Sequence, residues 1–395
     1  MTGKLLIAIG GLLLGLSLGF FFIRDLSSVL PKSNGTVARI DKALNLNSHQ
    51  IIGFLPYWLL DKADKDYSKY VTTLTYFSLT LNPDGTIQKL INPGEEDPGW
   101  YALHSGKADR FFDQAKKENV QLSLLVFSGS EEHIEGLMSD PVVHAQNLVN
   151  DVAPIMKQYG FTDLNLDIES VSTASDEARA HFTEFTREVK KQVNKHKLGT
   201  VTIDVSPTAL IKNYLINVKE LADTVDYVVF MTYDYHYPGS SVTGPVSPVG
   251  GARTEAEFDT RVAIEEALRI LKPEQILIGA PLYGYGWETI ADSPRSAVIP
   301  GTGLTYSNRK VEELLSECAT CSAKEDTVAK EQYVIYKDTD TGTYYQIFYP
   351  DSNSMSEKIK LAKEYGVGGV ALWALGYDGR TILDPLIDYK KTAGD

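Results

Sequence analysis

The sequence contains few of the residues that mark disulfide-rich or metal-dependent proteins. Of its 395 residues only 2 are cysteine and 7 are histidine. Two cysteines cannot build a disulfide scaffold, and they cannot fill the four positions of a structural zinc site. The histidines show no H-E-x-x-H or similar spacing. We therefore expect neither a metal nor another cofactor.

An excess of positive charge is also absent. The chain has 38 Lys and Arg residues against 52 Asp and Glu residues, a formal net charge of −14. Such a chain repels phosphate backbones, so we expect no nucleic acid partner, whereas a neutral glycan is unaffected by this field. The hydrophobic share of 43% is that of a globular protein with a sizeable core, which excludes global disorder.

One long apolar run begins the chain. Leu5 to Ile23 carries no charge and lies between Lys4 and Arg24. As a helix it would span about 28 Å, enough to cross the hydrocarbon core of a bilayer. We predict a signal-anchor in the membrane over residues 1–25 and a linker over 26–48, with a cleaved signal peptide as the alternative. Lys4 favours a catalytic domain outside the cytoplasm, anchored in the membrane or, after cleavage, secreted.

Short apolar runs alternate with amphipathic helical patterns in the rest of the chain. This order predicts an α/β fold, a single (β/α)8 TIM barrel. Its first seven strands would occupy residues 49–283, and the eighth strand and a C-terminal helix residues 368–395. Residues 284–367 are too many for one crossover and contain two strand-like runs around a turn, so we expect a small α+β insertion there. The eight strand candidates are Ile51–Leu55, Thr73–Leu79, Gln121–Phe127, Asp163–Glu169, Thr200–Ser206, Tyr227–Tyr233, Gln275–Tyr283 and Gly368–Leu375.

The fourth strand candidate alternates polar and apolar residues. Side chains alternate along a strand, and the outer face of a barrel strand packs against helices, so the leucines and isoleucine must point outward. The polar set then faces the barrel interior, where unpaired carboxylates cost several kcal/mol, so it indicates chemistry rather than stability. This polar stripe consists of Asp163, Asn165, Asp167 and Glu169.

Asp167 and Glu169 lie at the carboxyl end of this strand, where barrel enzymes hold their active sites. Residues i and i+2 lie about 6.6 Å apart and project in parallel, so the pair cannot flank a glycosidic bond as acid and nucleophile. If the site cleaves a glycoside, one carboxyl is the acid and the nucleophile comes from elsewhere. A 2-acetamido sugar can supply it by attacking its own anomeric carbon.

At this point the chain resembles glycoside hydrolase family 18, the chitinase-like enzymes, over most of residues 51–375. Asn165-x-Asp167-x-Glu169 resembles the end of the family's D-x-x-D-x-D-x-E signature. Other matches, in the family's order, are Met231-x-Tyr233-Asp234, Pro281-x-Tyr283-Gly284, the sugar-floor residue Trp373 and the aromatic walls Phe54 and Phe77.

The resemblance implies roles for these residues. Glu169 would protonate the leaving oxygen and then act as base, Asp167 would hold the acetamide, and Tyr233 would donate a hydrogen bond to its oxygen. Asp234 would complete the catalytic set. The implied substrate-binding residues are Phe54, Phe77, Asn165, Met231, Tyr283 and Trp373.

The signature is not matched throughout. Thr162 stands in place of its first Asp, Asp163 in place of a usual Gly, and Asn165 in place of its second Asp, while Ser170 follows the acid where many chitinases have Tyr. An amide cannot share a proton as a carboxylic acid can, so the control of Asp167 differs from the family pattern. Asn at this place resembles the bacterial cell-wall and spore-type branch, whose glycan is peptidoglycan.

We therefore predict a retaining, substrate-assisted glycosidase acting on β-1,4-linked N-acetylglucosamine polysaccharides, either peptidoglycan or chitin-like. The alternatives are a catalytically silent chitinase-like carbohydrate-binding protein and an enzyme of the same kind acting on N-linked glycans. Cys318 and Cys321 could form a local disulfide or remain free thiols, and Trp100 and Trp287 could be sugar platforms or loop anchors.

Overall fold

The computed structural model describes residues 49–170, 172–254, 257–318 and 321–392. The predicted signal-anchor over residues 1–25 and the linker over 26–48 lie outside this part of the chain. In the described residues no helix combines the length and the apolar character needed to span a bilayer.

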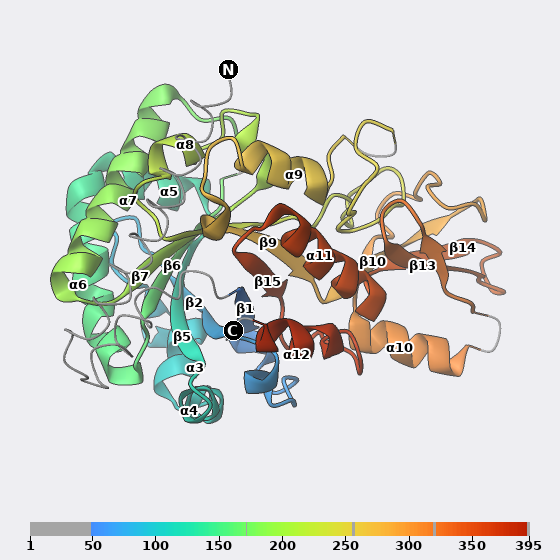
Figure 1. The fold of residues 1–395 in the computed structure, drawn as a ribbon, viewed down its shortest axis with the longest axis horizontal. Helices are drawn as coiled ribbons and strands as arrows, with labels where there is room; N and C mark the ends of the chain where they lie inside the picture. Colours follow the sequence, from blue (N-terminus) through green and yellow to red (C-terminus); the bar gives the residue numbers. More distant parts are fainter. Residues whose placement is uncertain (1–48, 171, 255–256, 319–320, 393–395) are drawn as a thin grey trace, which may run out of the picture. The chain divides into compact units, whose positions relative to one another are not determined.

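Eight parallel strands close into a barrel, which confirms the predicted (β/α)8 architecture (Figure 1). The strands follow one another around the barrel in the order β1, β15, β9, β8, β7, β6, β5 and β2. Their bounds are β1 Gln50–Pro56, β2 Thr73–Thr80, β5 Gln121–Ser128, β6 Asp163–Ile168, β7 Thr200–Val205, β8 Tyr227–Phe230, β9 Ile276–Pro281 and β15 Gly369–Trp373.

Helices connect these strands and cover the barrel. In α6, for example, the Asp140 side chain accepts a hydrogen bond from the Val143 amide, Pro141 is the first helical residue, and Gly160 ends the helix at φ +80°. The helices are α3 Pro98–His104, α4 Asp109–Lys117, α5 Glu131–Ser139, α6 Pro141–Tyr159, α7 Asp176–His196, α8 Val218–Leu221, α9 Thr260–Ala267, α11 Ser352–Tyr365 and α12 Asp384–Lys391. Short 3-10 turns are η1 Tyr57–Leu59, η2 Tyr67–Lys69, η3 Pro207–Leu210 and η4 Pro273–Gln275.

Two separate apolar clusters lie on the two faces of the barrel wall. The outer cluster joins strands to helices and includes Leu164, Leu166 and Ile168 of β6. The inner cluster fills one side of the barrel interior with residues such as Phe54 and Leu277. The alternation predicted for the fourth strand is therefore confirmed, and the interior beside β6 is polar.

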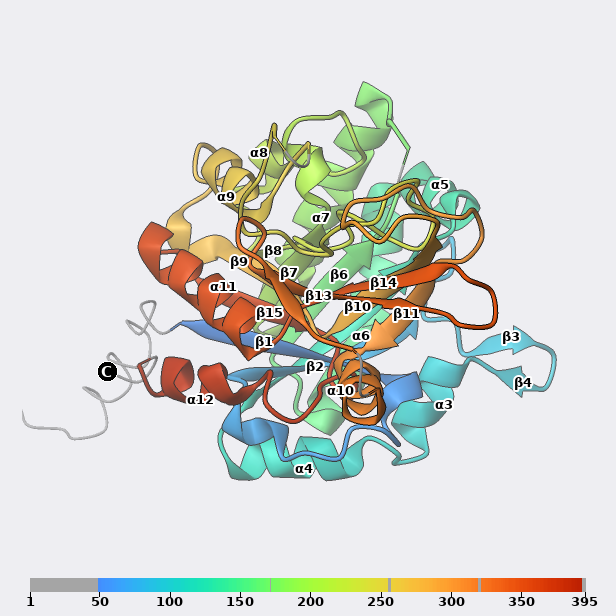
Figure 2. The same ribbon diagram turned by 90° about the vertical axis from the view of Figure 1, so that its right-hand side faces the viewer.

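A five-stranded antiparallel sheet lies between β9 and β15 in the chain, in the order β11, β10, β14, β13, β12 (Figures 1 and 2). It begins at Tyr283, with one residue between it and the end of β9, and its last strand ends at Tyr349. Helix α11 contacts β9 and β15 as a barrel helix. The insertion's elements are β10 Tyr283–Thr289, β11 Leu304–Ser307, α10 Asn308–Glu317, β12 Lys324–Asp326, β13 Glu331–Lys337 and β14 Tyr344–Tyr349.

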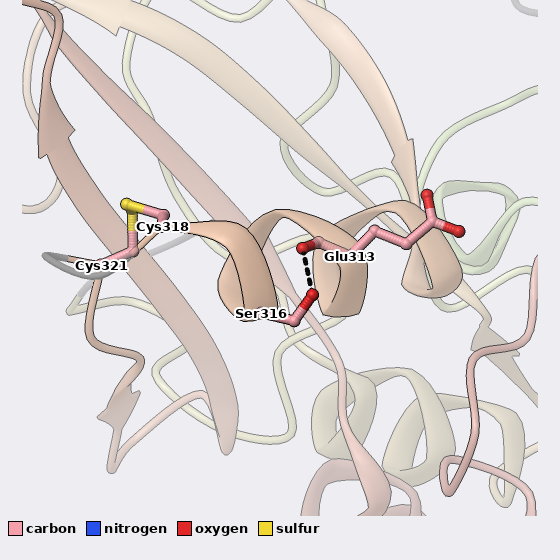
Figure 3. Close-up of a disulfide and its surroundings, with 4 residues drawn as sticks. All are labelled: Glu313, Ser316, Cys318 and Cys321. Atoms are coloured by element: carbon pink, nitrogen blue, oxygen red, sulfur yellow. Dashed lines mark hydrogen bonds between the residues drawn. A yellow bond between two sulfur atoms is a disulfide. The ribbon is translucent and has the colours of Figure 1, made fainter.

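Two local features complete the fold. Cys318 and Cys321 form a disulfide just beyond the end of α10, where Ser316 Oγ donates a hydrogen bond to the Glu313 carbonyl (Figure 3). After β2, a turn at Asn82–Gly85 returns the chain antiparallel, and a two-stranded ribbon, β3 Leu90–Asn92 and β4 Glu95–Glu96, follows.

Candidate active site

The first residue of the polar stripe, Asp163, is buried and fully hydrogen-bonded. Its carboxylate accepts bonds from the hydroxyls of Ser123 at 2.6 Å, Thr200 at 2.6 Å and Thr202 at 3.0 Å. Burial raises the pKa of Asp163, although the three hydroxyls oppose that rise. Because every oxygen of this carboxylate is engaged from neighbouring strands, Asp163 ties β5, β6 and β7 together below the site.

The middle of the stripe is buried and only partly hydrogen-bonded. Asn165 Nδ2 donates to Asp204 Oδ1 of β7 at 3.2 Å, and Asn165 Oδ1 has no partner among the described residues. Within the same part of the chain, Asp167 Oδ1 also lacks a partner. Burial first, and then the charges of Asp204 and Glu169, raise the pKa of Asp167 well above its usual value. An inward-facing acid with an unused oxygen is an acceptor available to a ligand.

Glu169 is the first residue after β6, and its amide donates to the Ser128 carbonyl at 2.9 Å. Its side chain is exposed to the solvent of a cavity at the barrel mouth. Partial desolvation by the cavity walls, and then the charge of Asp234, raise the pKa of Glu169. The next residue, Ser170, donates its hydroxyl proton to the Glu131 carboxylate of α5 at 3.0 Å. This acid is thus placed to hold its proton to higher pH than an ordinary carboxyl while facing open space.

The segment after β8 carries the Met231-x-Tyr233-Asp234 motif. A Cβ added to Gly279 of β9 would lie 2.7 Å from the Tyr233 ring, so the glycine makes room for this tyrosine. Burial and the surrounding carboxylates raise the pKa of Tyr233 well above its usual value, so its hydroxyl remains a proton donor. Asp234, at φ +59°, accepts hydrogen bonds from the hydroxyls of Tyr283 at 2.5 Å and Tyr285 at 2.8 Å.

A cavity of about 440 Å³ opens over the carboxyl ends of β6, β7 and β8. Its further walls come from the segment after β7, Ser206–Tyr214, and from α9. The structure brings four predicted site residues together in the lining of this cavity: Glu169, Met231, Tyr233 and Asp234. Its volume is in the range of small-molecule sites.

The predicted aromatic residues form a cluster on β1, β2 and β15, across the barrel from β6. The Trp373 ring centroid lies 4.6 Å from that of Phe77 and 5.8 Å from that of Phe54. None of the three lines the 440 Å³ cavity. Tyr283 links the two groups, because it packs edge-on against Tyr233 at 6.4 Å and belongs with Trp373 to one apolar cluster. The predicted site thus has a carboxylate side and an aromatic side.

Two residues of this region were not identified from the sequence. Asp204 lies in the strand candidate Thr200–Ser206, where Val201, Ile203 and Val205 alternate with polar residues just as in β6. Trp58 follows β1 in η1, is 46% exposed, and stands edge-on to Phe77 and Trp373 at 5.5 and 6.4 Å. For Asp204 the alternation was a usable signal, whereas nothing in the pattern indicated Trp58.

Other candidates have plainer environments. Trp287 of β10 is completely buried and donates its indole proton to the Tyr237 carbonyl, so it anchors the loop that contains Tyr237. Trp100 is half-buried and packs against His104. His236 lines the cavity, but burial lowers its pKa and its Nδ1 lies 2.8 Å from the Pro245 carbonyl oxygen. Across the described ranges, no cluster of three or more His, Cys, Asp or Glu side chains could hold a metal ion.

Comparison with known proteins gives a consistent picture. The family described as "Glycosyl hydrolases family 18" matches residues 48–378. A cortical fragment-lytic enzyme of Bacillus subtilis is 25% identical over 80% of this chain and 67% of its own length. The crystal structure of a Bacillus cereus spore cortex-lytic enzyme has a TM-score of 0.69 at 20% identity, covering 87% of this chain and 74% of that one. A group IV chitinase of Ostrinia furnacalis, solved with allosamidin, has a TM-score of 0.73 at 18% identity, covering 87% and 98%.

Proposed function

The chain belongs to the glycosyl hydrolases of family 18 and is a glycosidase, and from that premise we propose that it is a retaining, substrate-assisted hydrolase of β-1,4-linked N-acetylglucosamine glycans. The observation that carries the proposal is the shared cavity of Glu169, Met231, Tyr233 and Asp234, with Asp167 buried beside it. One proton donor faces open space there, and Asp167, two residues before it in β6, projects beside it rather than from the opposite side of a bound glycosidic bond.

In the proposed first step, Glu169 gives its proton to the oxygen of the leaving sugar. The carbonyl oxygen of the substrate's own acetamide attacks the anomeric carbon as the glycosidic bond breaks, which forms a cyclic oxazolinium cation. In the second step Glu169 takes a proton from water, whose oxygen attacks the anomeric carbon and reopens the ring. Two inversions at one carbon give overall retention, and Glu169 regains its proton.

The environments of the other residues support this sequence. Asp167 has an unpartnered buried oxygen that suits the acetamide N–H and the positive charge that develops on the ring. Tyr233 keeps its phenolic proton, because its pKa is raised well above the usual value, and can donate to the acetamide oxygen. Asp234, held by Tyr283 and Tyr285, adds negative charge that helps Glu169 to stay protonated.

The aromatic side supplies the sugar-binding surface in this proposal. The Trp373 face, walled by Phe54 and Phe77, suits the CH surface of a pyranose ring. Exposed Trp58 extends this surface toward solvent, where a further sugar of the chain can stack.

We propose peptidoglycan as the substrate. Support comes from Asn165 in the signature and from the similarity to an enzyme named for lysis of cortical fragments. We further propose an extracytoplasmic location through the predicted signal-anchor at residues 1–25. The disulfide Cys318–Cys321 agrees with an oxidising compartment.

Incubation of the protein with chitin oligomers and with purified peptidoglycan, followed by mass analysis, tests the proposal. We expect fragments with N-acetylglucosamine at the new reducing end. Binding to both glycans with no fragments would instead support the catalytically silent carbohydrate-binding protein.

A further inference from the structure

We propose that Asp204 is the charged partner of Asp167, a positioning residue on the neighbouring strand that sets the pH at which Asp167 loses its proton and becomes free to act on the acetamide. The inference rests on the proposed function, since it concerns how Asp167 is kept in the required state. It assigns to β7 an acid that the stripe on β6 lacks at position 165.

The strand register places the two acids side by side. In the parallel pair of β6 and β7, Asn165 lies opposite Thr202 and Leu166 opposite Ile203. One step further along both strands brings Asp167 opposite Asp204, and both residues belong to the inward-facing set. Neighbouring strands are about 4.8 Å apart, so these carboxyls share one desolvated space. Asp167 is 3% exposed and Asp204 is 4% exposed.

The two carboxyls lie among other acids. Asp163 lies on the β6 side below Asp204, Glu169 lies beyond Asp167, and Tyr233 approaches from the segment after β8. In the described part of the chain neither Asp167 nor Asp204 forms an ion pair. Two adjacent carboxyls in such a space do not both ionise at the pH usual for a carboxyl, so the pair keeps its second proton to higher pH. Consistently, burial and neighbouring negative charges raise the pKa of each acid well above its usual value.

Asp204 is the member suited to be ionised in the unliganded pair. Asn165 Nδ2 donates to Asp204 Oδ1, and such a hydrogen bond favours the ionised form of the carboxyl that accepts it. Asn165 itself cannot take the proton, because an amide does not titrate in this range. Asp167 then holds the proton, because within the described residues its buried Oδ1 has no partner. Above the pH at which this proton leaves, Asp167 is free to act on the acetamide N–H and on the developing cation.

The test begins with Asp204→Asn, which keeps the size and the contact to Asn165 but removes the titrating group. The negative charge of Asp204 raises the pKa of Asp167, so its loss lets Asp167 ionise at lower pH. We expect the acidic limb of the kcat/KM profile on chitin oligomers to move to lower pH by about one unit. A merely structural role would lower activity equally at every pH and leave this limb in place.

A relocation variant provides the matched control. Asn165→Asp combined with Asp204→Asn moves the second acid from β7 to β6 without changing the number of carboxyls. We expect this double variant to return the acidic limb toward the parent position. Asn165→Asp alone adds a further buried acid, and we expect it to move the limb to higher pH.

A second readout does not depend on turnover. The native pair holds protons that the unfolded chain has released, so its contribution to stability falls as pH rises from the unfolded carboxyl pKa toward the raised native values. The melting temperature of Asp204→Asn relative to the parent should therefore be higher near pH 7 than near pH 4. An unchanged acidic limb, or a pH-independent difference in melting temperature, would overturn the role of Asp204. A parent protein that cleaves no glycan, yet shows the melting difference, would instead overturn the proposed function.

Discussion

Tyr283 donates its phenolic proton to Asp234 Oδ1 across 2.5 Å, and this bond joins the first strand of the insertion to the loop that carries Tyr233. Tyr285, two residues further along β10, donates to the same oxygen at 2.8 Å. The insertion therefore does more than extend the barrel wall. It fixes a carboxylate whose negative charge helps Glu169 to keep its proton.

Replacing that carboxylate should change the pH profile. Burial raises the pKa of Glu169 first, and the charge of Asp234 raises it further. Asp234→Asn removes this second contribution, so Glu169 loses its proton at lower pH. We expect the alkaline limb of the kcat/KM profile to move to lower pH by roughly half a unit to one unit. Asp113→Asn, which removes the same charge from an exposed residue of α4 outside the cavity lining, should leave the limb in place.

A second prediction concerns the acetamide group of the substrate. If it is the nucleophile, an oligosaccharide whose sugar at the cleavage site has been de-N-acetylated lacks the attacking oxygen. We expect no cleavage at the bond that follows such a sugar, while bonds after acetylated sugars in the same chain are still cut. Mass analysis of the products from defined, partly deacetylated oligomers measures this. Efficient cutting after a deacetylated sugar would rule out the substrate-assisted route.

Trp58 should affect binding rather than chemistry. Its exposed ring stands beside Trp373 at the open side of the aromatic cluster. A stacked ring contributes about 1 kcal/mol, so Trp58→Ala should raise KM for longer oligomers roughly fivefold and leave kcat nearly unchanged. Trp58→Phe keeps a stacking face and should restore most of the loss. An equal KM for parent and Ala variant at every chain length would contradict a sugar platform at this position.

The strand alternation made most of the barrel and the polar stripe predictable. On β6 the period of two is unambiguous, because Leu164, Leu166 and Ile168 are all strongly apolar and the opposite set is polar. The same alternation exists on β7, but a single Asp among threonine and serine did not stand out. Its significance depends on the register between β6 and β7, which a single strand pattern does not contain.

The cavity wall and the hydrogen bonds to Asp234 could not be predicted, because they depend on loop paths and on contacts between distant parts of the chain. The cavity wall comes from η3 and α9, whose paths over the barrel mouth no residue period specifies. The length of the segment between β9 and β15 indicated an insertion. Its hydrogen bonds from Tyr283 and Tyr285 to Asp234 span 49 and 51 residues, and such contacts arise only from the folded chain.

The most direct measurement is the turnover of Glu169→Gln on chitin oligomers and purified peptidoglycan, compared with its binding of the same glycans. Glutamine keeps the shape of the side chain but cannot give up a proton. We predict that turnover falls by a factor of about a hundred to ten thousand, while the affinity for the glycans stays close to that of the parent. Hydrolysis by this variant at the parent's rate would show that Glu169 is not the acid.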